Sequence, residues 1–166
     1  MQRGFTLIEL LVTISVAAIL LGIAVPSYNH LIQSNRASTT ANRLLSTFML
    51  ARSEAIQRNQ RVVVCIVQSG SDACDTSATA WENGLMVFAD ANNDGKRDAQ
   101  EAVIQVERPF AQQTRITGNS NVARAVSFDA GGRTSRVGTL TVDAGDNPDY
   151  KRSIVISTTG RSRVKS

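Results

Sequence analysis

A run of twelve residues, Asp90 to Glu101, carries side-chain oxygens at the spacing that a calcium ion requires. Acid or amide side chains stand at its first, third, fifth and ninth places, a glycine at the sixth and a glutamate at the twelfth. Calcium takes six or more oxygen ligands, and this pattern can wrap them around one ion. The candidate calcium ligands are Asp90, Asn92, Asp94, Lys96, Asp98 and Glu101.

The same segment also suits a turn without metal. Its flanks, 84–89 and 102–106, are strand-like, so the segment is not an EF-hand. Clusters of Asp, Asn and Gly form hairpin turns by themselves, and Lys96 and Arg97 can neutralise the acids. Both interpretations stay open, and the metal-free turn is favoured. Calcium is the one cofactor that the sequence suggests.

Two cysteines, Cys65 and Cys74, lie nine positions apart. A metal site would need further cysteine or histidine ligands, but the single histidine, His30, falls in a segment predicted to be helical. The spacing is not that of a redox Cys-x-x-Cys pair. If the domain lies outside the cytoplasmic membrane, we expect a structural disulfide, worth about 2.5–3 kcal/mol in the chain-entropy model.

An acid stands inside an apolar run near the N-terminus. After Arg3 and Gly4 the chain stays apolar to Val25, apart from Glu9 and a few hydroxyl side chains. A bare carboxylate in hydrocarbon costs about 2.5 kcal/mol or more, so Glu9 is a candidate functional residue. Counted from Phe5, the run is long enough to cross a bilayer as a helix.

The chain that follows predicts one long helix and then strands. We expect Pro26 to bend the helix, which continues as an amphipathic rod to about Arg58 because small and apolar residues recur every three or four positions. These residues are Ala41, Leu44, Leu45, Phe48, Ala51 and Ala55. Predicted strands follow at 61–67, 84–89, 102–106, 115–117, 124–128, 139–142 and 153–157. This order predicts an α+β fold, with the helix across an antiparallel sheet.

Charge and motif content bear on the kind of partner. The formal net charge is +4, yet residues 72–107 hold eight acids against two basic residues, and residues 108–166 hold ten basic residues against four acids. This asymmetry indicates an anionic partner at the C-terminal end, and charge alone favours the alternative of a solvated basic surface. No nucleophile elbow, phosphate loop or histidine of the soluble part suggests catalysis, so we predict a protein that is not an enzyme.

The N-terminal residues Arg3-Gly4-Phe5-Thr6-Leu7-Ile8-Glu9 resemble the class III signal of type IV prepilins and pseudopilins. The resemblance implies that a prepilin peptidase cleaves between Gly4 and Phe5 and methylates the new N-terminus at Phe5. It also implies that Glu9 pairs with the N-terminal amine of a neighbouring subunit. The expected parts are a leader at 1–4, a membrane-spanning half-helix at 5–26, an amphipathic half-helix at 27–58 and a β-rich domain at 59–166.

The remainder of the chain resembles the GspH/FimT group of minor pilins and pseudopilins. The residues that carry the resemblance are Cys65 and Cys74, Trp81 with Gly84, 87–92, 126–128 with 131–133, and 154–163. The resemblance implies a pilin-like fold, other pilin subunits as partners, and a single-pass protein of the bacterial inner membrane with its C-terminal domain in the periplasm. One branch of the group works in type IV pili and the other in type II secretion.

DNA-binding members of this group carry a Gly-Arg-x-Arg segment, which here reads Gly160-Arg161-Ser162-Arg163 and is followed by Lys165. In an extended tail the three cations share one face, about 6–7 Å apart, and Gly160 frees the backbone at its base. Lys151, Arg152 and Arg133 are expected to extend the patch. We therefore predict a minor type IV pilin that binds double-stranded DNA without sequence preference, for uptake in natural transformation. The alternatives are a type II secretion pseudopilin and, from the acidic segment alone, a calcium-dependent tip module.

Overall fold

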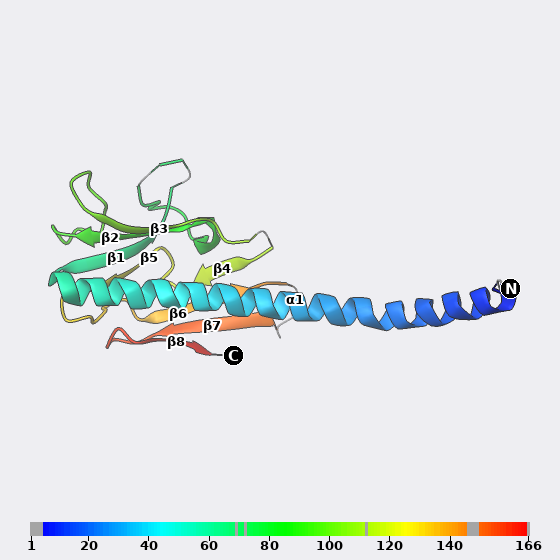
Figure 1. Ribbon diagram of the computed structural model, residues 1–166. Coiled ribbons are helices and arrows are strands. Elements are labelled where there is room, and N and C mark those ends of the chain that lie inside the picture. Colours follow the sequence, from blue (N-terminus) through cyan, green and yellow to red (C-terminus); the bar gives the residue numbers. More distant parts are fainter. Residues whose placement is uncertain (1–4, 69, 72, 112, 146–149, 166) are drawn as a thin grey trace.

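The structure is a computed structural model and describes residues 5–68, 70–71, 73–111, 113–145 and 150–165. The predicted leader, with Gly4, lies outside these residues. Figure 1 shows a long helix whose C-terminal half carries all the strands and whose N-terminal half extends away from them.

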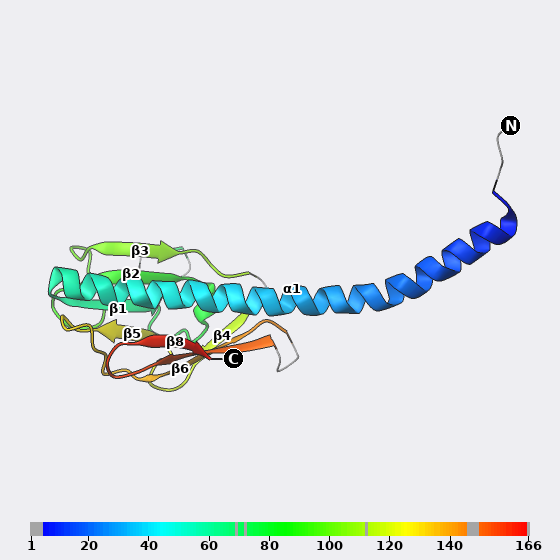
Figure 2. The same cartoon turned by 60° about the horizontal axis from the view of Figure 1, so that its bottom comes forward.

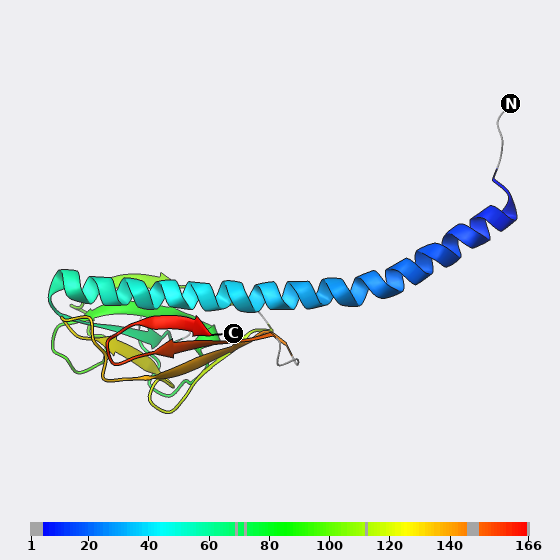
Figure 3. The ribbon, with the colours of Figure 1, turned by 90° about the horizontal axis from the view of Figure 1, so that it is seen from below.

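Helix α1 (Leu7–Arg58) is capped by Thr6 at its N-terminus and by Asn59 at its C-terminus. The Thr6 hydroxyl accepts a hydrogen bond from the Glu9 N–H, and the Glu9 carboxylate accepts one from the Thr6 N–H at 3.0 Å. This reciprocal cap satisfies N–H groups that the first turn of a helix leaves unpaired. The helix runs unbroken through position 26 and curves within its N-terminal half (Figure 2, Figure 3). Its predicted continuation past the apolar run is confirmed.

The strands form two antiparallel sheets of four strands each, rather than the one sheet predicted. The first sheet has the order β3-β2-β1-β5, and the second has the order β4-β6-β7-β8. The first contains β1 (Arg61–Ile66), β2 (Leu85–Asp90), β3 (Val103–Glu107) and β5 (Ala125–Phe128). The second contains β4 (Arg115–Gly118), β6 (Gly138–Asp143), β7 (Lys151–Ile156) and β8 (Ser162–Lys165). A short 3-10 helix, η1 (Trp81–Asn83), precedes β2.

The core lies between α1 and both sheets. The helix presents small side chains at its closest approach, and Ala41, Ala51 and Ala55 are fully buried. Phe48 lies among them and meets the Trp81 ring edge-on at 6.1 Å between centroids. The Trp81 indole N–H, although buried, donates to the carbonyl oxygens of Val122 and Ala123. Alanine on the helix thus brings the backbone close to the sheets, and the two aromatic rings fill the remaining space.

The segment after Gly160 is the main departure from the predicted fold. It is not a tail but the edge strand β8, which pairs with β7 so that Val164 lies opposite Ile154 and Arg163 opposite Val155. Val164 packs against the core, whereas Arg163 is exposed. The alternation of one apolar residue with charged residues is too short to register as a strand by pattern, but the β7 ladder supplies its hydrogen bonds.

We expect Phe48→Ala to lower the free energy of unfolding by about 3–5 kcal/mol, because it removes a fully buried ring next to Trp81. Met49→Ala is the matched control, since Met49 is 60% exposed. Thermal unfolding of the full chain in a non-ionic detergent, followed by near-UV circular dichroism of the tryptophan, measures both. Equal melting of the two variants would contradict the core described here.

Candidate functional site

The N-terminal half of α1 is exposed on every side. All described side chains from Phe5 to Ala24 are exposed, and this part of the helix is long and apolar enough to cross a membrane. Glu9 is exposed within it, and both of its side-chain hydrogen bonds, from the Thr6 N–H and the Thr6 hydroxyl, use Oε2. Within the described part of the chain, Glu9 Oε1 therefore has no partner. The geometry leaves a carboxylate oxygen open for a second molecule.

The acidic loop between β2 and β3 bonds several of its own side-chain oxygens, but the buried Asp90 Oδ1 has no hydrogen-bond partner among the described residues. Asp90, the buried first residue, accepts from the Gly95 N–H at 3.0 Å and pairs with the Arg61 guanidinium at 3.2 Å. Glu101 accepts from the N–H groups of Ala91 and Asp98. Burial raises the pKa of the Asp90 carboxyl, while Arg61 and the Gly95 N–H act in the opposite direction.

Other candidate calcium ligands in this loop also face their own backbone or one another. Asn92 Oδ1 accepts from the Asp94 N–H, and Asp94 Oδ1 accepts from the Lys96 N–H. Asn92 turns its amide nitrogen, not its oxygen, toward Asp98 Oδ2 at 3.0 Å. Among the described residues no group of three or more His, Cys, Asp or Glu side chains is arranged to hold a metal ion. In this arrangement the loop fits a metal-free turn closed by Arg61, and calcium binding stays a prediction.

The predicted disulfide between Cys65 and Cys74 is confirmed, with 5.7 Å between the Cα atoms. Cys65 lies in β1, and Val67 forms an isolated bridge with Cys74, so the loop folds back against the strand. The two cysteines belong to a small apolar cluster with Val63, Met86 and Phe88, separate from the main core. The disulfide therefore holds a loop over that cluster and lies on the sheet that does not contain β8.

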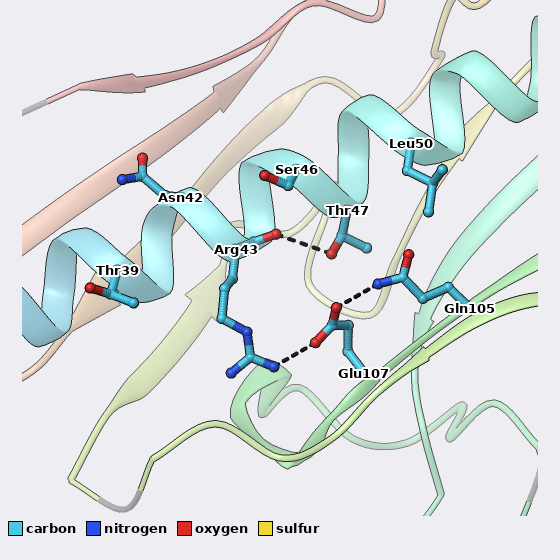
Figure 4. Close-up of a pocket in the computed structure, with 8 residues that line it drawn as sticks. All are labelled: Thr39, Asn42, Arg43, Ser46, Thr47, Leu50, Gln105 and Glu107. Carbon is cyan, nitrogen blue, oxygen red and sulfur yellow. Dashed lines mark hydrogen bonds and ion pairs between the residues drawn. The ribbon is translucent and has the colours of Figure 1, made fainter.

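A hollow between α1 and β3 brings together residues distant in sequence (Figure 4). The Arg43 guanidinium pairs with Glu107 and lies 4.6 Å from the centre of the Phe110 ring, while Gln105 donates to the other Glu107 oxygen. These contacts fasten the edge strand β3 to the helix. Sequence reasoning missed them because Arg43 and Glu107 stand 64 positions apart, and neither has a distinctive local pattern.

Three of the basic residues predicted to bind DNA stand in β8 or directly before it. Arg161, Arg163 and Lys165 are exposed, whereas Ser162 and Val164 between them are half-buried. This alternation places Arg163 and Lys165 on one face of the strand, and Arg161, directly before β8, follows the same alternation. The register sets Lys165 opposite Ser153, so the neighbouring part of that face carries small and uncharged side chains of β7.

Arg133 reaches the same region through a contact between two turns. Gly132 and Gly160 both adopt positive φ, 69° and 73°, and a Cβ built on Gly160 would lie only 1.9 Å from the Gly132 carbonyl oxygen. The Thr134 N–H donates to the Thr158 carbonyl beside this contact. Gly160 is therefore required by the close approach of two backbones, not by freedom at the base of a tail.

Arg52 of α1 closes the contact between these turns. Its Nε donates to the Gly132 carbonyl at 2.9 Å, the same oxygen that approaches Gly160. We call Arg52, Gly132 and Gly160 the glycine junction; Arg133 and Arg161 each follow one of its glycines. Arg52 was not identified from the sequence. Its position between Ala51 and Ala55, two residues of the buried helix face, could have pointed to Arg52. A long side chain at the border of such a face can reach a neighbouring loop.

The two remaining candidates lie at the far end of β7. Lys151 is exposed on the same face as Arg163 but pairs with Asp143 of β6 at 3.2 Å. Arg152 has the opposite parity in the strand and bonds to the Ser34 hydroxyl of α1 at 3.3 Å. The structure thus sets the turn that carries Arg133 against the turn that precedes β8, and it places Arg152 on the other face of β7.

Comparisons with known proteins define the class. The fold, with its exposed apolar helix and antiparallel sheets, is that of a type IV pilin or pseudopilin. The chain belongs to the GspH family: the family model described as type II transport protein GspH matches residues 40–160, and the prokaryotic N-terminal methylation motif matches residues 1–25. Members of this family assemble with other pilin or pseudopilin subunits and are not enzymes.

Individual relatives come from both branches. The chain is 28% identical over 172 residues to the pilin-like protein PilA1 of Thermus thermophilus, covering 99% of each chain. Its fold is similar to that of the type IV minor pilin FimU of Pseudomonas aeruginosa, with a TM-score of 0.64 and 21% identity. The match covers 80% of this chain and 90% of FimU. The fold is also similar to that of the minor pseudopilin EpsH from the Type 2 Secretion System of Vibrio cholerae, with a TM-score of 0.56 and 16% identity. That match covers 79% of this chain and 97% of EpsH.

We expect Glu101→Gln to lower the melting temperature of the full chain by the same amount with calcium and with chelator. Its carboxylate caps two backbone N–H groups whether or not an ion is present, and the amide retains only one acceptor oxygen. Glu54→Gln, which changes an acid in the ion pair with Arg58, is the control outside the loop. A loss seen only with calcium would establish the ion site.

Proposed function

We propose that this protein is a minor type IV pilin whose basic β8 edge binds double-stranded DNA for uptake in natural transformation. The observation that carries the proposal is the alignment of Arg161, Arg163 and Lys165 on the exposed face of an edge strand. Spacing of about 6–7 Å between alternate residues suits contacts with successive phosphates. Contacts of this kind confer affinity without sequence preference, as uptake of arbitrary DNA requires.

The second part of the proposal concerns the N-terminal segment and its role in filament assembly. A prepilin peptidase cleaves the inner-membrane precursor between Gly4 and Phe5 and methylates Phe5, and the domain from 59 onward lies in the periplasm. Glu9 then receives the N-terminal amine of a neighbouring subunit as the helix enters the filament. The unpartnered Oε1 of an exposed acid in an apolar helix supports this role, because a neighbour's ammonium group offsets the cost of placing the acid in hydrocarbon.

A second candidate function is that of a minor pseudopilin in type II secretion. The match to the family model described as type II transport protein GspH favours it, and so does the fold likeness to EpsH. In that case the β8 edge contacts a neighbouring subunit at the filament tip instead of DNA. The two functions predict different effects of the same basic-to-neutral substitutions in β8, so an experiment can distinguish DNA binding from a role in secretion.

We expect Glu9→Leu to leave the protein in the membrane and sharply reduce its incorporation into sheared filaments, because the apolar span remains while the acceptor of the incoming amine is lost. Ser15→Leu is the matched control, since among the described residues the Ser15 hydroxyl bonds only within its own helix, to the Leu11 carbonyl. Mass spectrometry of incorporated wild-type protein should find methylated Phe5 at its N-terminus. Normal incorporation of Glu9→Leu, or a start at Met1, would refute the assembly proposal.

We expect the full chain in non-ionic detergent to bind labelled duplex DNA, with a log–log salt slope of about −2.7 for three phosphate contacts. Replacing Arg161 and Arg163 together by Gln should remove most of the binding and reduce the slope. The melting temperature should change little because both side chains point to solvent. Arg→Lys at both positions should retain part of the affinity, because charge survives but the planar fork is lost.

The matched control for this double variant is the replacement of Arg108 and Arg124 by Gln. Both are exposed and lie outside β7 and β8, and the net charge changes equally. Fluorescence anisotropy at several salt concentrations measures all proteins. Equal binding by the two double variants would remove β8 from the proposal. The absence of wild-type binding at moderate salt, together with disturbed tip assembly in the β8 variant, would favour the secretion function.

A further inference from the structure

The strand β8 does not end the basic surface, because a groove opens between its beginning and α1. The groove is lined by Met49, Arg52, Ser53 and Ile56 from the helix and by Gly160, Arg161 and Ser162 from the other side. Two arginines from segments more than a hundred positions apart therefore line one hollow. We propose that this groove is a phosphate-binding subsite of the nucleic-acid surface, with Arg52 as a direct contact; this inference rests on the proposed DNA binding.

The hydrogen bonding of Arg52 prepares it for this role. Only Nε is used, toward the Gly132 carbonyl at 2.9 Å, and within the described part of the chain the two terminal nitrogens make no other hydrogen bond. A guanidinium held by one edge presents its remaining N–H groups in a fixed direction, so less side-chain entropy is lost when an anion binds. A phosphate oxygen matches this planar fork better than a single carbonyl does.

Hydroxyl groups supply further donors at the same place. Ser53 is exposed beside Arg52 on the helix. The Ser162 hydroxyl is buried and has no hydrogen-bond partner among the described residues, although Ser162 lines the groove. A buried hydroxyl without a partner costs free energy, and an anion in the groove offers it an acceptor. The groove thus combines two cations with two hydroxyl donors.

The position of the groove favours nucleic acid over a lipid headgroup as the source of the phosphate. Arg52 lies 26 residues beyond position 26 on the same helix, or about 40 Å along its axis. A bilayer that holds residues 5–26 cannot reach so far. The strand β8, by contrast, begins at the groove and runs back along α1 (Figure 2), so one DNA backbone can follow Arg52, Arg161, Arg163 and Lys165 in turn.

The test compares Arg52→Gln with Arg58→Gln in the full chain in non-ionic detergent, with labelled duplex DNA. Arg58 is exposed on the same helix and pairs with Glu54, so the control removes the same charge outside the groove. Arg52→Gln should weaken binding about tenfold, the worth of one charged hydrogen bond. It should also reduce the magnitude of the salt slope by about 0.9. Arg58→Gln should bind like the wild type.

Arg52→Lys separates contact from positioning. Lysine retains the charge but not the Nε bond to Gly132, so a direct phosphate contact predicts a wild-type salt slope with a smaller loss of affinity. If Arg52 only holds the glycine junction in place, Arg52→Lys will be as weak as Arg52→Gln, and the subsite is refuted. Equal binding by Arg52→Gln and Arg58→Gln refutes it as well. If Arg52→Gln does not fold, the salt slope and affinity of Arg52→Lys, compared with those of wild type, test the direct contact.

Failure of the subsite and failure of the proposed function give different results. If wild type binds DNA and the Arg161 and Arg163 double variant does not, DNA binding at β8 stands whatever Arg52 does. If wild type does not bind at all, the proposed function fails, and the phosphate subsite fails with it.

Inorganic phosphate added as a competitor should displace DNA from wild type more readily than from Arg52→Gln.

Discussion

The close approach of α1 to two sheets is the constraint on which the rest of this structure depends. The buried positions of the helix carry no large side chain except Phe48 and Leu44, and the others are alanine or threonine. The core it completes is shared, because residues of both sheets belong to one apolar cluster with the helix. The helix residues of this cluster pack against the inner faces of both sheets. The helix therefore extends away from the domain at its N-terminal end and joins the two sheets at its C-terminal end.

That shared core explains why the basic strand is placed so definitely. Val164 enters the cluster from β8, and Gly160 fits against Gly132 beside Arg52 of the helix. The cations alternate with residues that face inward, so their direction is set by packing rather than by local flexibility. A solvated tail would lose conformational freedom on binding a polyanion, whereas an edge strand has already lost it during folding.

Much of the architecture was predictable because its signals are local. The apolar run, the amphipathic spacing to Arg58 and the β-branched strands all repeat within a few residues, and the helix and most strands lie within two residues of their predicted bounds. The disulfide followed from the two cysteines once an oxidising compartment was assumed. The division into two sheets was not predictable, because sequence pattern does not show which strands pair across long loops.

The candidate site shows the same division. Alternation placed Arg161, Arg163 and Lys165 on one face, as the structure has them. Charge alone also grouped Arg152 with them, but its parity in β7 points it toward Ser34. Arg52 had no signal of charge clustering or motif; its importance depends on a backbone contact between two turns that are 28 positions apart. Gly160 was recognised for the wrong reason, since glycine is needed there for its positive φ and for the close approach of Gly132, and not for the flexibility of a tail.

The direction of β8 has a mechanical consequence. The strand runs lengthwise beside α1 (Figure 3). Its hydrogen bonds to β7 lie across that direction. A ligand that pulls on β8 along the axis of the helix loads all of these bonds together, in shear, instead of opening them one after another from the end. The same strand pulled sideways would peel bond by bond. The domain is thus built to resist tension along the axis by which it is attached, and to release its edge under a transverse load.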